Sequence, residues 1–207
     1  MTTTIDEVID FWFGEPAHDE DAVLAKVRRW FGGGDEVDRE LRERFGAAVE
    51  AALAGALDGW ADTMRGRLAL VLLLDQLTRN CFRGDARTYA GDPKARALVL
   101  EAFDRGLDRE LGFAERIFLS MPLLHSEELA HHERLAELSP SLTGDPPPGW
   151  ARFAAMNREQ TVKYLDIIRR FGRFPHRNAL LGRTSTPDEE AFLADWAERA
   201  APQGVKG

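Results

Sequence analysis

An unbroken run of apolar residues, Leu68 to Leu74, constrains the fold of this chain more than any other feature. The run lies in a segment, about residues 63–81, that we expect to be one helix. A helix that is apolar on every side belongs in a protein interior. The run has seven residues, far fewer than the roughly 20 that a membrane helix needs. It therefore predicts a central buried helix surrounded by other helices, and no membrane association.

Helical spacing of apolar residues continues along the rest of the chain. Val37, Leu41, Phe45 and Val49 form a stripe with one apolar residue every fourth position. No segment alternates β-branched and polar residues as a half-buried strand would. With short connections between successive helices, this pattern predicts an all-α, antiparallel helical superhelix or bundle of about eight or nine helices. We expect it to form a single domain over residues 1–207.

Capping residues mark where several helices should begin. Asp92 is a candidate N-cap, and Pro93 suits the first helical position after it. Thr186, with Glu189 three residues later, predicts a capping box at the start of the last helix. We expect residues 202–207, beyond that helix, to fray.

Prolines should end other helices. A short helix that starts near residue 113 is expected to stop before Pro122, and Ser126 then caps a helix over about residues 127–138. Four prolines and a glycine between residues 139 and 148 predict a linker. The longest helix should follow that linker.

Composition excludes several classes of protein. The net charge of −8 argues against a general binder of nucleic acid or of anionic membranes. The single cysteine, Cys81, cannot form an intrachain disulfide, and the first residues lack the basic and apolar regions of a secretion signal. We therefore expect a cytoplasmic protein. Because there is neither a phosphate-binding glycine loop nor a dinucleotide turn, we predict no cofactor.

A first group of polar residues directly follows the apolar run. Asp75 should face the interior, where an unpaired charge is very costly. Arg79 and Arg83 follow at intervals of four residues on the same side of the helix, so Arg79 is the local partner for Asp75. Gln76 and Asn80 lie on the adjacent strip. The group indicates either a structural ion pair or an aspartate that orients an arginine toward a ligand.

A second group precedes the helix expected at about residues 127–138. His125 comes just before the cap, Ser126, so its ring is free of helix geometry and can face a cleft. Glu127 suits the first helical turn, where the helix dipole favours an acidic side chain. That preference alone would explain the glutamate, whereas a position beside His125 would also suit proton transfer.

The same helix carries a spacing typical of metal sites. Glu128 and His131 match the Glu-x-x-His spacing of carboxylate-bridged metal centres. Such centres need a second copy on a facing helix, and none follows from the sequence. We therefore predict no metal site, and we expect His131 and His132 to lie at the surface.

A basic segment follows the longest helix. Residues 171–178 read Phe-Gly-Arg-Phe-Pro-His-Arg-Asn, and the glycine and proline exclude a plain helix. Arg173, His176 and Arg177 lie in this segment, and Arg183 follows shortly after. Planar guanidinium groups bind phosphates and carboxylates through two parallel hydrogen bonds. The segment indicates either an anion pocket or a clamp in which arginines pair with the acidic residues of the protein.

Several motifs together resemble the bacterial domain-of-unknown-function 924 family. They are Phe-Trp-Phe-Gly at 11–14, Asp-Gln-x-x-Arg-Asn at 75–80, Phe-Arg-Gly at 82–84, Pro-Leu-x-His-Ser-Glu at 122–127 and the segment at 171–178. The resemblance covers about residues 5–195. It implies an all-helical domain with a tetratricopeptide-like superhelical arrangement, and no established activity.

The resemblance also implies which polar positions recur. They are Asp75, Gln76, Arg79, Asn80, Arg83, His125, Ser126, Glu127, Arg173, His176, Arg177, Asn178 and Arg183. The chain departs from the family pattern at Leu77 and Thr78, where an aromatic residue and a proline are usual, which implies a less kinked helix end. It also has Tyr164 where relatives often have a histidine, so a phenol stands at that position.

Together these residues predict an internal pocket for a small anionic molecule, a phosphate or a carboxylate. His125, Glu127 and His176 are the candidates for proton transfer, which would make the protein an enzyme. The candidate ligand-binding residues are Asp75, Gln76, Arg79, Asn80, Arg83, Ser126, Arg173, Arg177, Asn178 and Arg183. Two alternatives stay open: a tetratricopeptide-like adaptor that binds a peptide carboxylate, and a purely structural salt-bridge cluster.

Overall fold

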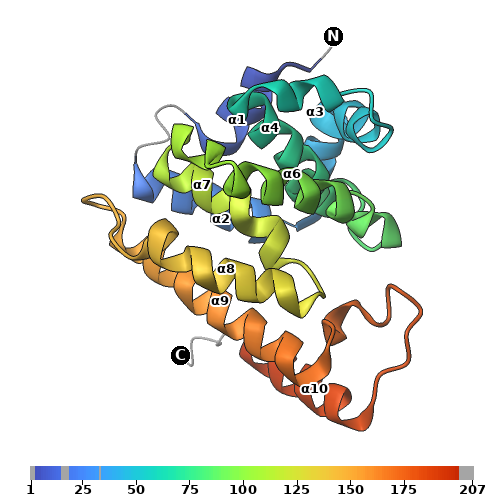
Figure 1. Cartoon of the computed structure of the whole chain (residues 1–207). Helices are drawn as coiled ribbons and strands as arrows, with labels where there is room; N and C mark the ends of the chain where they lie inside the picture. Colours follow the sequence, from blue (N-terminus) through green and yellow to red (C-terminus); the bar gives the residue numbers. More distant parts are fainter. Residues whose placement is uncertain (1–2, 15–18, 33, 201–207) are drawn as a thin grey trace, which may run out of the picture.

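The structure, a computed structural model, describes residues 3–14, 19–32 and 34–200, except for the side chains of 30–32 and 198–200 (Figure 1). This part of the chain is helical throughout and contains no β-strand, which confirms the all-α prediction. The α-helices are α1 (Ile5–Phe13), α2 (Glu20–Gly32), α3 (Gly34–Leu53), α4 (Met64–Val71), α5 (Thr78–Cys81), α6 (Asp92–Asp104), α7 (Phe113–Leu124), α8 (Leu129–Thr143), α9 (Ala151–Phe171) and α10 (Pro187–Ala200). Shorter helical turns are η1 (Asp58–Asp62), η2 (Leu72–Leu77), η3 (Ala86–Tyr89), η4 (Leu107–Glu110) and η5 (Pro175–Arg177).

The apolar run forms the centre of the molecule, as expected. α4, η2 and α5 follow one another without a break, and each residue from Leu68 to Leu74 is at most 1% exposed. α1, α3, α6 and α7 pack around this central helix (Figure 1). The stripe on α3 from Val37 to Val49 is buried against it. Burial on all sides explains why no residue from Leu68 to Leu74 is polar.

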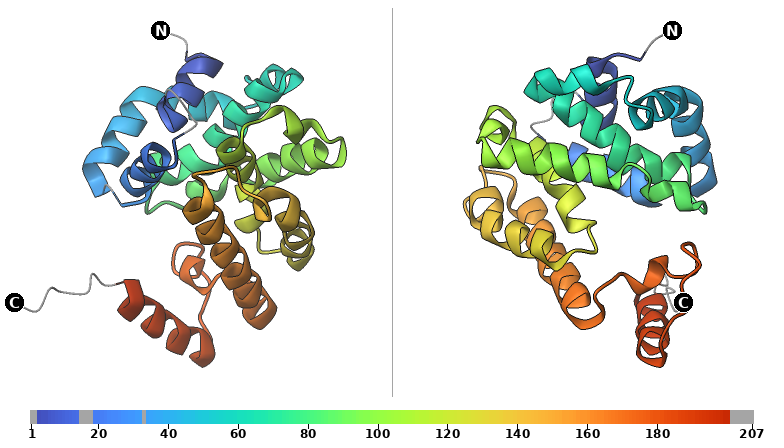
Figure 2. Two further views of the ribbon diagram at one scale, coloured as in Figure 1. Left: turned by 90° about the vertical axis from the view of Figure 1, so that its left-hand side faces the viewer. Right: turned by 45° about the vertical axis from the view of Figure 1, so that its right-hand side comes forward.

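The C-terminal part is built on the longest helix, α9. α8 packs along α9, which ends at Gly172 in a left-handed conformation (φ +67°) that glycine adopts without strain. Beyond it, η5 and α10 pack around a small second core that contains Ile167, Ile168 and Phe174. Figure 2 shows α10 (red) at the far end of α9, away from α1–α7. The candidate site lies where η5 returns toward the central helix.

Two helices continue through prolines that we expected to end them. α7 includes Pro122, and α8 includes Pro140. A proline in a late turn removes one backbone hydrogen bond. The residues beyond, such as Leu123 and Leu142, are buried in the core, so packing outweighs the local preference. Residues 139–143 of the expected linker are therefore helical.

Two expected N-caps were wrong. α6 begins at Asp92 with Gly91 as its N-cap, because the Asp92 carboxylate pairs with arginines instead of its own backbone. α8 begins at Leu129, two residues later than expected. The Ser126 hydroxyl does accept a hydrogen bond from the Glu128 amide, at 3.0 Å, but this turn precedes the helix.

The last helix begins as expected. The Glu189 carboxylate accepts a hydrogen bond from the Thr186 amide at 2.8 Å, and the Thr186 hydroxyl accepts one from the Glu189 amide at 3.3 Å. Residues 202–207, for which we expected fraying, lie outside the described part. Among the described helices, none combines the length and apolarity that crossing a membrane requires.

Candidate functional site

The site begins at a widened turn of the central helix. η2 is a π-helical turn, a form that occurs mostly as a single turn and frequently at functional sites. The Thr78 hydroxyl donates to the Leu74 carbonyl at 2.9 Å, and the Arg79 guanidinium donates to the Asp75 carbonyl. Side chains thus satisfy carbonyl groups that the wide turn leaves open. The turn holds the Asp75 carboxylate, which is 0% exposed, next to the end of α7.

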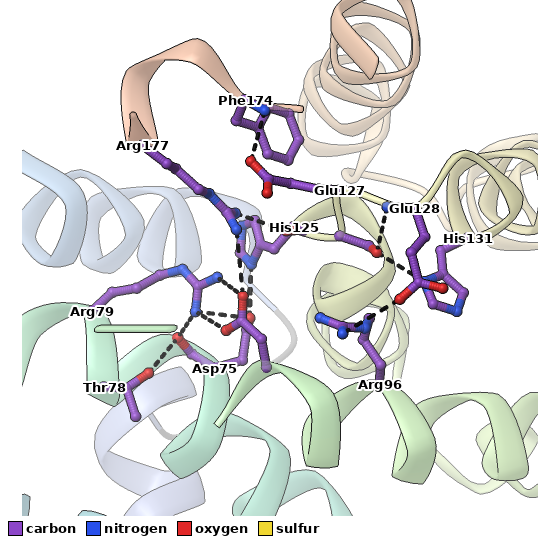
Figure 3. A network of polar contacts seen from close by, with 12 residues as sticks. Asp75, Thr78, Arg79, Arg96, His125, Glu127, Glu128, His131, Phe174 and Arg177 are labelled. Carbon is purple, nitrogen blue, oxygen red and sulfur yellow. Dashed lines mark hydrogen bonds and ion pairs between the residues drawn. The ribbon is translucent and has the colours of Figure 1, made fainter. Parts of the chain in front are cut away.

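Asp75 pairs with two basic groups. Arg79 Nη1 lies 2.9 Å from Asp75 Oδ1, which confirms the expected pair, and His125 Nδ1 lies 2.8 Å from the same oxygen (Figure 3). Gln76 Nε2 donates to the other carboxylate oxygen. Burial alone would raise the pKa of Asp75, but the charges of Arg79 and His125 and these hydrogen bonds lower it to about 2. Asp75 is therefore a buried carboxylate that stays ionised at neutral pH.

Asp75 orients the ring of His125. Because an ionised carboxylate can only accept hydrogen bonds, His125 Nδ1 carries the proton, and Nε2 of the neutral ring has a free lone pair. Burial lowers the pKa of His125, and the opposing charge of Asp75 does not fully offset it. A neutral imidazole with its Nδ1–H on a carboxylate is the arrangement that general-base histidines share.

Asp92 completes the charge balance around Arg79. Arg79 donates to both Asp92 oxygens, at 3.2 and 3.3 Å. The start of α6 comes close enough for this because Gly91 has no side chain: a Cβ there would lie 2.2 Å from the Leu74 carbonyl oxygen. The role of Asp92 as a partner of Arg79 was not predicted, because an aspartate before Pro93 is also what a helix start requires. The buried position of Gly91 against η2 has no local sequence signal.

Arg177, from η5, is a buried cation with incomplete compensation. Its guanidinium lies 4.3 Å from the ring centre of Tyr89, and its Nη2 donates to the backbone carbonyl of His125 at 2.7 Å (Figure 3). The nearest acidic contact is Asp92 Oδ2, at 3.6 Å from Nη1, and Nε makes no hydrogen bond within the described residues. Burial and then the charge of Arg79 lower the pKa of Arg177. An added anion would therefore stabilise this guanidinium.

These groups face a pocket of about 320 Å³. Six of the residues singled out from the sequence line it: Arg79, Asn80, Arg83, His125, His176 and Arg177. Tyr89, Tyr164 and Leu180 add an apolar edge. Asp75 and Gln76 lie behind His125 and Arg79, where they position these side chains. Segments far apart in sequence therefore meet at this place.

The rim of the pocket holds a second ion pair. Arg83 donates to Asp38 on α3, at 2.9 Å from Nη2 to Oδ1, and the side-chain amide of Asn80 donates to the same oxygen at 2.9 Å. Asp38 was not among the residues singled out from the sequence. A signal existed, because Asp38 precedes Leu41 and Phe45 by three and seven residues and so shares their buried face.

The remaining predicted residues form a clamp outside the pocket. Glu127 accepts hydrogen bonds from Arg183, at 2.7 and 2.9 Å, and from the Phe174 amide, at 2.8 Å. Arg173 donates to Glu189 at 2.6 and 2.8 Å. This pairing is the first cause of a lowered Glu189 pKa, about 2. The clamp holds η5, and so Arg177, against the end of α7.

Asn178 and Ser126 have structural partners as well. The Asn178 amide donates to the Ser185 hydroxyl at 3.0 Å. The Ser126 hydroxyl lies 2.8 Å from His131 Nδ1 and is itself 1% exposed. Neither side chain is among those that line the pocket.

His132 differs from the expectation, and His176 lies at the edge of the site. His132 is 0% exposed, not at the surface, and its Nε2 lies 2.7 Å from the Ser126 carbonyl oxygen, to which it donates. His176 is exposed at the pocket rim, but its ring lies between those of Phe174 and Trp196, at 5.3 and 5.9 Å. Burial of that ring face, and then Arg177, lower the pKa of His176.

We predict that the protein loses stability in mild acid, because three of its histidines are buried or partly buried. Burial lowers the pKa of His125, His131 and His132 below the unfolded value of about 6.5. Between the folded and unfolded pKa values the unfolded chain binds more protons, so this contribution is present above about pH 6.5 and is lost as the pH falls through the folded values. Urea unfolding from about pH 8 to 4.5 should show this decline, and His132→Gln should lessen it. A free energy of unfolding that stays constant down to about pH 5 would contradict the prediction.

Comparisons with known proteins agree with this architecture. The family model for a bacterial protein of unknown function (DUF924) matches residues 8–196. A solved structure of a protein of unknown function from Agrobacterium tumefaciens is 36% identical, with a TM-score of 0.75 over 92% of this chain and 97% of that one. No curated protein matches the chain. The resemblance seen in the motifs is thereby confirmed, and the chain belongs to the bacterial DUF924 family.

Proposed function

We propose that the protein binds a small anionic molecule in the pocket beside Arg177. The observation that carries the proposal is the state of this guanidinium, which is buried, has an unused Nε donor and lies 3.6 Å from its nearest carboxylate oxygen. A buried charge without full compensation is costly unless a partner arrives. A phosphate or carboxylate would supply the negative charge and accept from the guanidinium fork.

The size of the pocket favours a small molecule over a peptide. A pocket of about 320 Å³ lies at the lower end of the range typical of small-molecule sites. The arginines that an adaptor would use to hold a peptide carboxylate, Arg173 and Arg183, already pair with Glu189 and Glu127. The purely structural alternative accounts for those two pairs, but it leaves Arg177 without a carboxylate oxygen nearer than 3.6 Å.

The pocket also has the groups for proton transfer. His125 Nε2 would accept a proton from a bound ligand or a water molecule, and Asp75 would stabilise the resulting imidazolium through Nδ1–H. Tyr164 lines the same pocket, and because burial raises its pKa, the phenol keeps its proton at neutral pH and can donate a hydrogen bond to a ligand. We propose an acid–base enzyme with His125 as the base. Glu127 would act by positioning η5, and His176 would act at the rim.

The proposal also covers the cellular location of the protein and the type of its helical arrangement. We propose a cytoplasmic protein, for which a single buried cysteine is suitable. We interpret the stacked helices as a tetratricopeptide-like arrangement, in which the concave side meets η5.

Arg177→Met is expected to weaken anion binding about 10- to 100-fold. A hydrogen bond to a charged group contributes about 1.5–3 kcal/mol, and methionine keeps the bulk of the side chain while removing the fork. Isothermal titration calorimetry with phosphate, sulfate and acetate measures the change. The matched control is Arg152→Met, because Arg152 is a surface arginine that pairs with Glu20 outside the pocket. Equal affinities of both variants, or no binding of any of the three anions to the wild type, would overturn the proposal.

A further inference from the structure

A second pocket adjoins the first on the other side of His125. It has a volume of about 340 Å³ and lies between α2, α7 and α9. Its walls are mainly apolar side chains, among them Val27, Ile117, Phe118, Met121, Phe153 and Met156. Gln160, which is exposed, lies at its edge. We call this space the apolar chamber.

The apolar chamber and the polar pocket share two lining residues. His125 and Tyr164 belong to the walls of both. A molecule whose charged end meets Arg177 would therefore have its remaining atoms next to His125 and Tyr164, at the boundary with an apolar space. The same two residues are the proposed base and the proposed hydrogen-bond donor.

An amide in the wall of the chamber is available to a ligand. Asn157 is 8% exposed and lines the chamber, and its side chain forms no hydrogen bond with the described part of the chain. Its amide atoms are not among the fully buried atoms that lack a partner, so they reach the space of the chamber. A ligand in the chamber would therefore meet one polar partner among apolar side chains such as Phe118 and Phe153.

We propose that the ligand is a small amphipathic anion. Its carboxylate or phosphate head binds at Arg177 and Arg79, its apolar body passes His125 and Tyr164 into the apolar chamber, and a polar atom near its far end meets Asn157. The inference rests on the proposed anion site and adds the chemical class of the ligand. Head and body contribute separately, because one is held by charge and the other by removal of apolar surface from water.

The experiment is a chain-length series of straight-chain carboxylates, from acetate through butyrate and hexanoate to octanoate, titrated calorimetrically. Each methylene buried in the chamber should raise affinity about three- to fourfold until the chamber is filled. Met156→Trp should fill the chamber and abolish the rise while acetate affinity stays unchanged. Val162→Trp is the matched control, because Val162 lies on the same helix and is 60% exposed.

The possible outcomes distinguish the amphipathic ligand from the anion site on which it rests. A rise with chain length in the wild type and in Val162→Trp, but not in Met156→Trp, supports the amphipathic ligand. If acetate and phosphate bind through Arg177 but octanoate binds no tighter than acetate, the inference is overturned and the anion site stands. Tighter octanoate binding that Arg177→Met leaves unchanged also overturns it, because the head would then not be at Arg177. The wild-type series decides even if Met156→Trp does not fold.

Discussion

Asp75→Ala should destabilise the fold by about 3–5 kcal/mol, because it removes the central carboxylate of a buried ionic cluster. Arg79 would lose its 2.9 Å contact and keep Asp92 as its acidic partner, and His125 would lose the acceptor of its Nδ1–H. Urea unfolding at about pH 7.5, where Asp75 is ionised, measures the loss. Asp75→Asn is the matched control: it keeps the shape and an acceptor oxygen, so its effect should be smaller.

A loss below about 1 kcal/mol for Asp75→Ala would show that Asp92 alone compensates Arg79 and that the cluster is not a cooperative unit. An equal loss for Asp75→Asn and Asp75→Ala would show that charge matters and the hydrogen-bond geometry does not.

Because burial and charge oppose each other at Asp75, its low pKa also predicts that this contribution persists down to about pH 4 and is lost toward pH 2.

Phe174→Ala should have a comparable effect, about 3–5 kcal/mol, because truncation of a buried aromatic leaves a cavity. Phe174 is 0% exposed and contacts the rings of Tyr164 and His132, at centroid distances of 5.3 and 6.0 Å. It is the link between the small second core and α8. Its loss should release η5, so anion affinity should fall together with stability.

Denaturant unfolding measures the stability of Phe174→Ala, and hydrogen exchange of residues 172–197 shows where the loss occurs. Leu181→Ala is the control, since Leu181 lies in the turn after η5 and is 37% exposed. Faster exchange confined to the C-terminal segment would agree with the account. Unchanged exchange there, with weakened protection in α4 instead, would show that Phe174 supports the main core rather than the clamp.

The local features of this fold could be predicted from sequence because helical geometry is a short-range rule. The run from Leu68 to Leu74 indicated the central helix, and the four-residue interval from Asp75 to Arg79 indicated their ion pair. The capping box at Thr186 is likewise complete within four residues. In each case the partners belong to one helix, so a single sequence contains the whole geometry.

Partners from different helices could not be predicted in this way. Asp38 and Asp92 pair with Arg83 and Arg79 across intervals of 45 and 13 residues, and nothing in their neighbourhood specifies those partners. The end of α7 shows the same limit, because Pro122 suggests a stop whereas core packing keeps the helix intact.

The basic segment shows how far the site itself could be predicted. The sequence indicated that Arg173, Arg177 and Arg183 leave the longest helix together, and the structure brings all three near the end of α7. The positions of Glu127 and Glu189 decide which arginines have an acidic partner, and the fold sets those positions. Only Arg177 of the three lines the pocket.

The most direct test of the account is a crystal of the wild-type protein soaked in selenate and measured for anomalous scattering. The account predicts an ordered selenium peak in the pocket, with an oxygen within hydrogen-bond distance of the Arg177 guanidinium and no such peak in crystals of Arg177→Met. Selenate that orders elsewhere on the surface while the space between Arg177, Arg79 and His125 stays without a peak would contradict it.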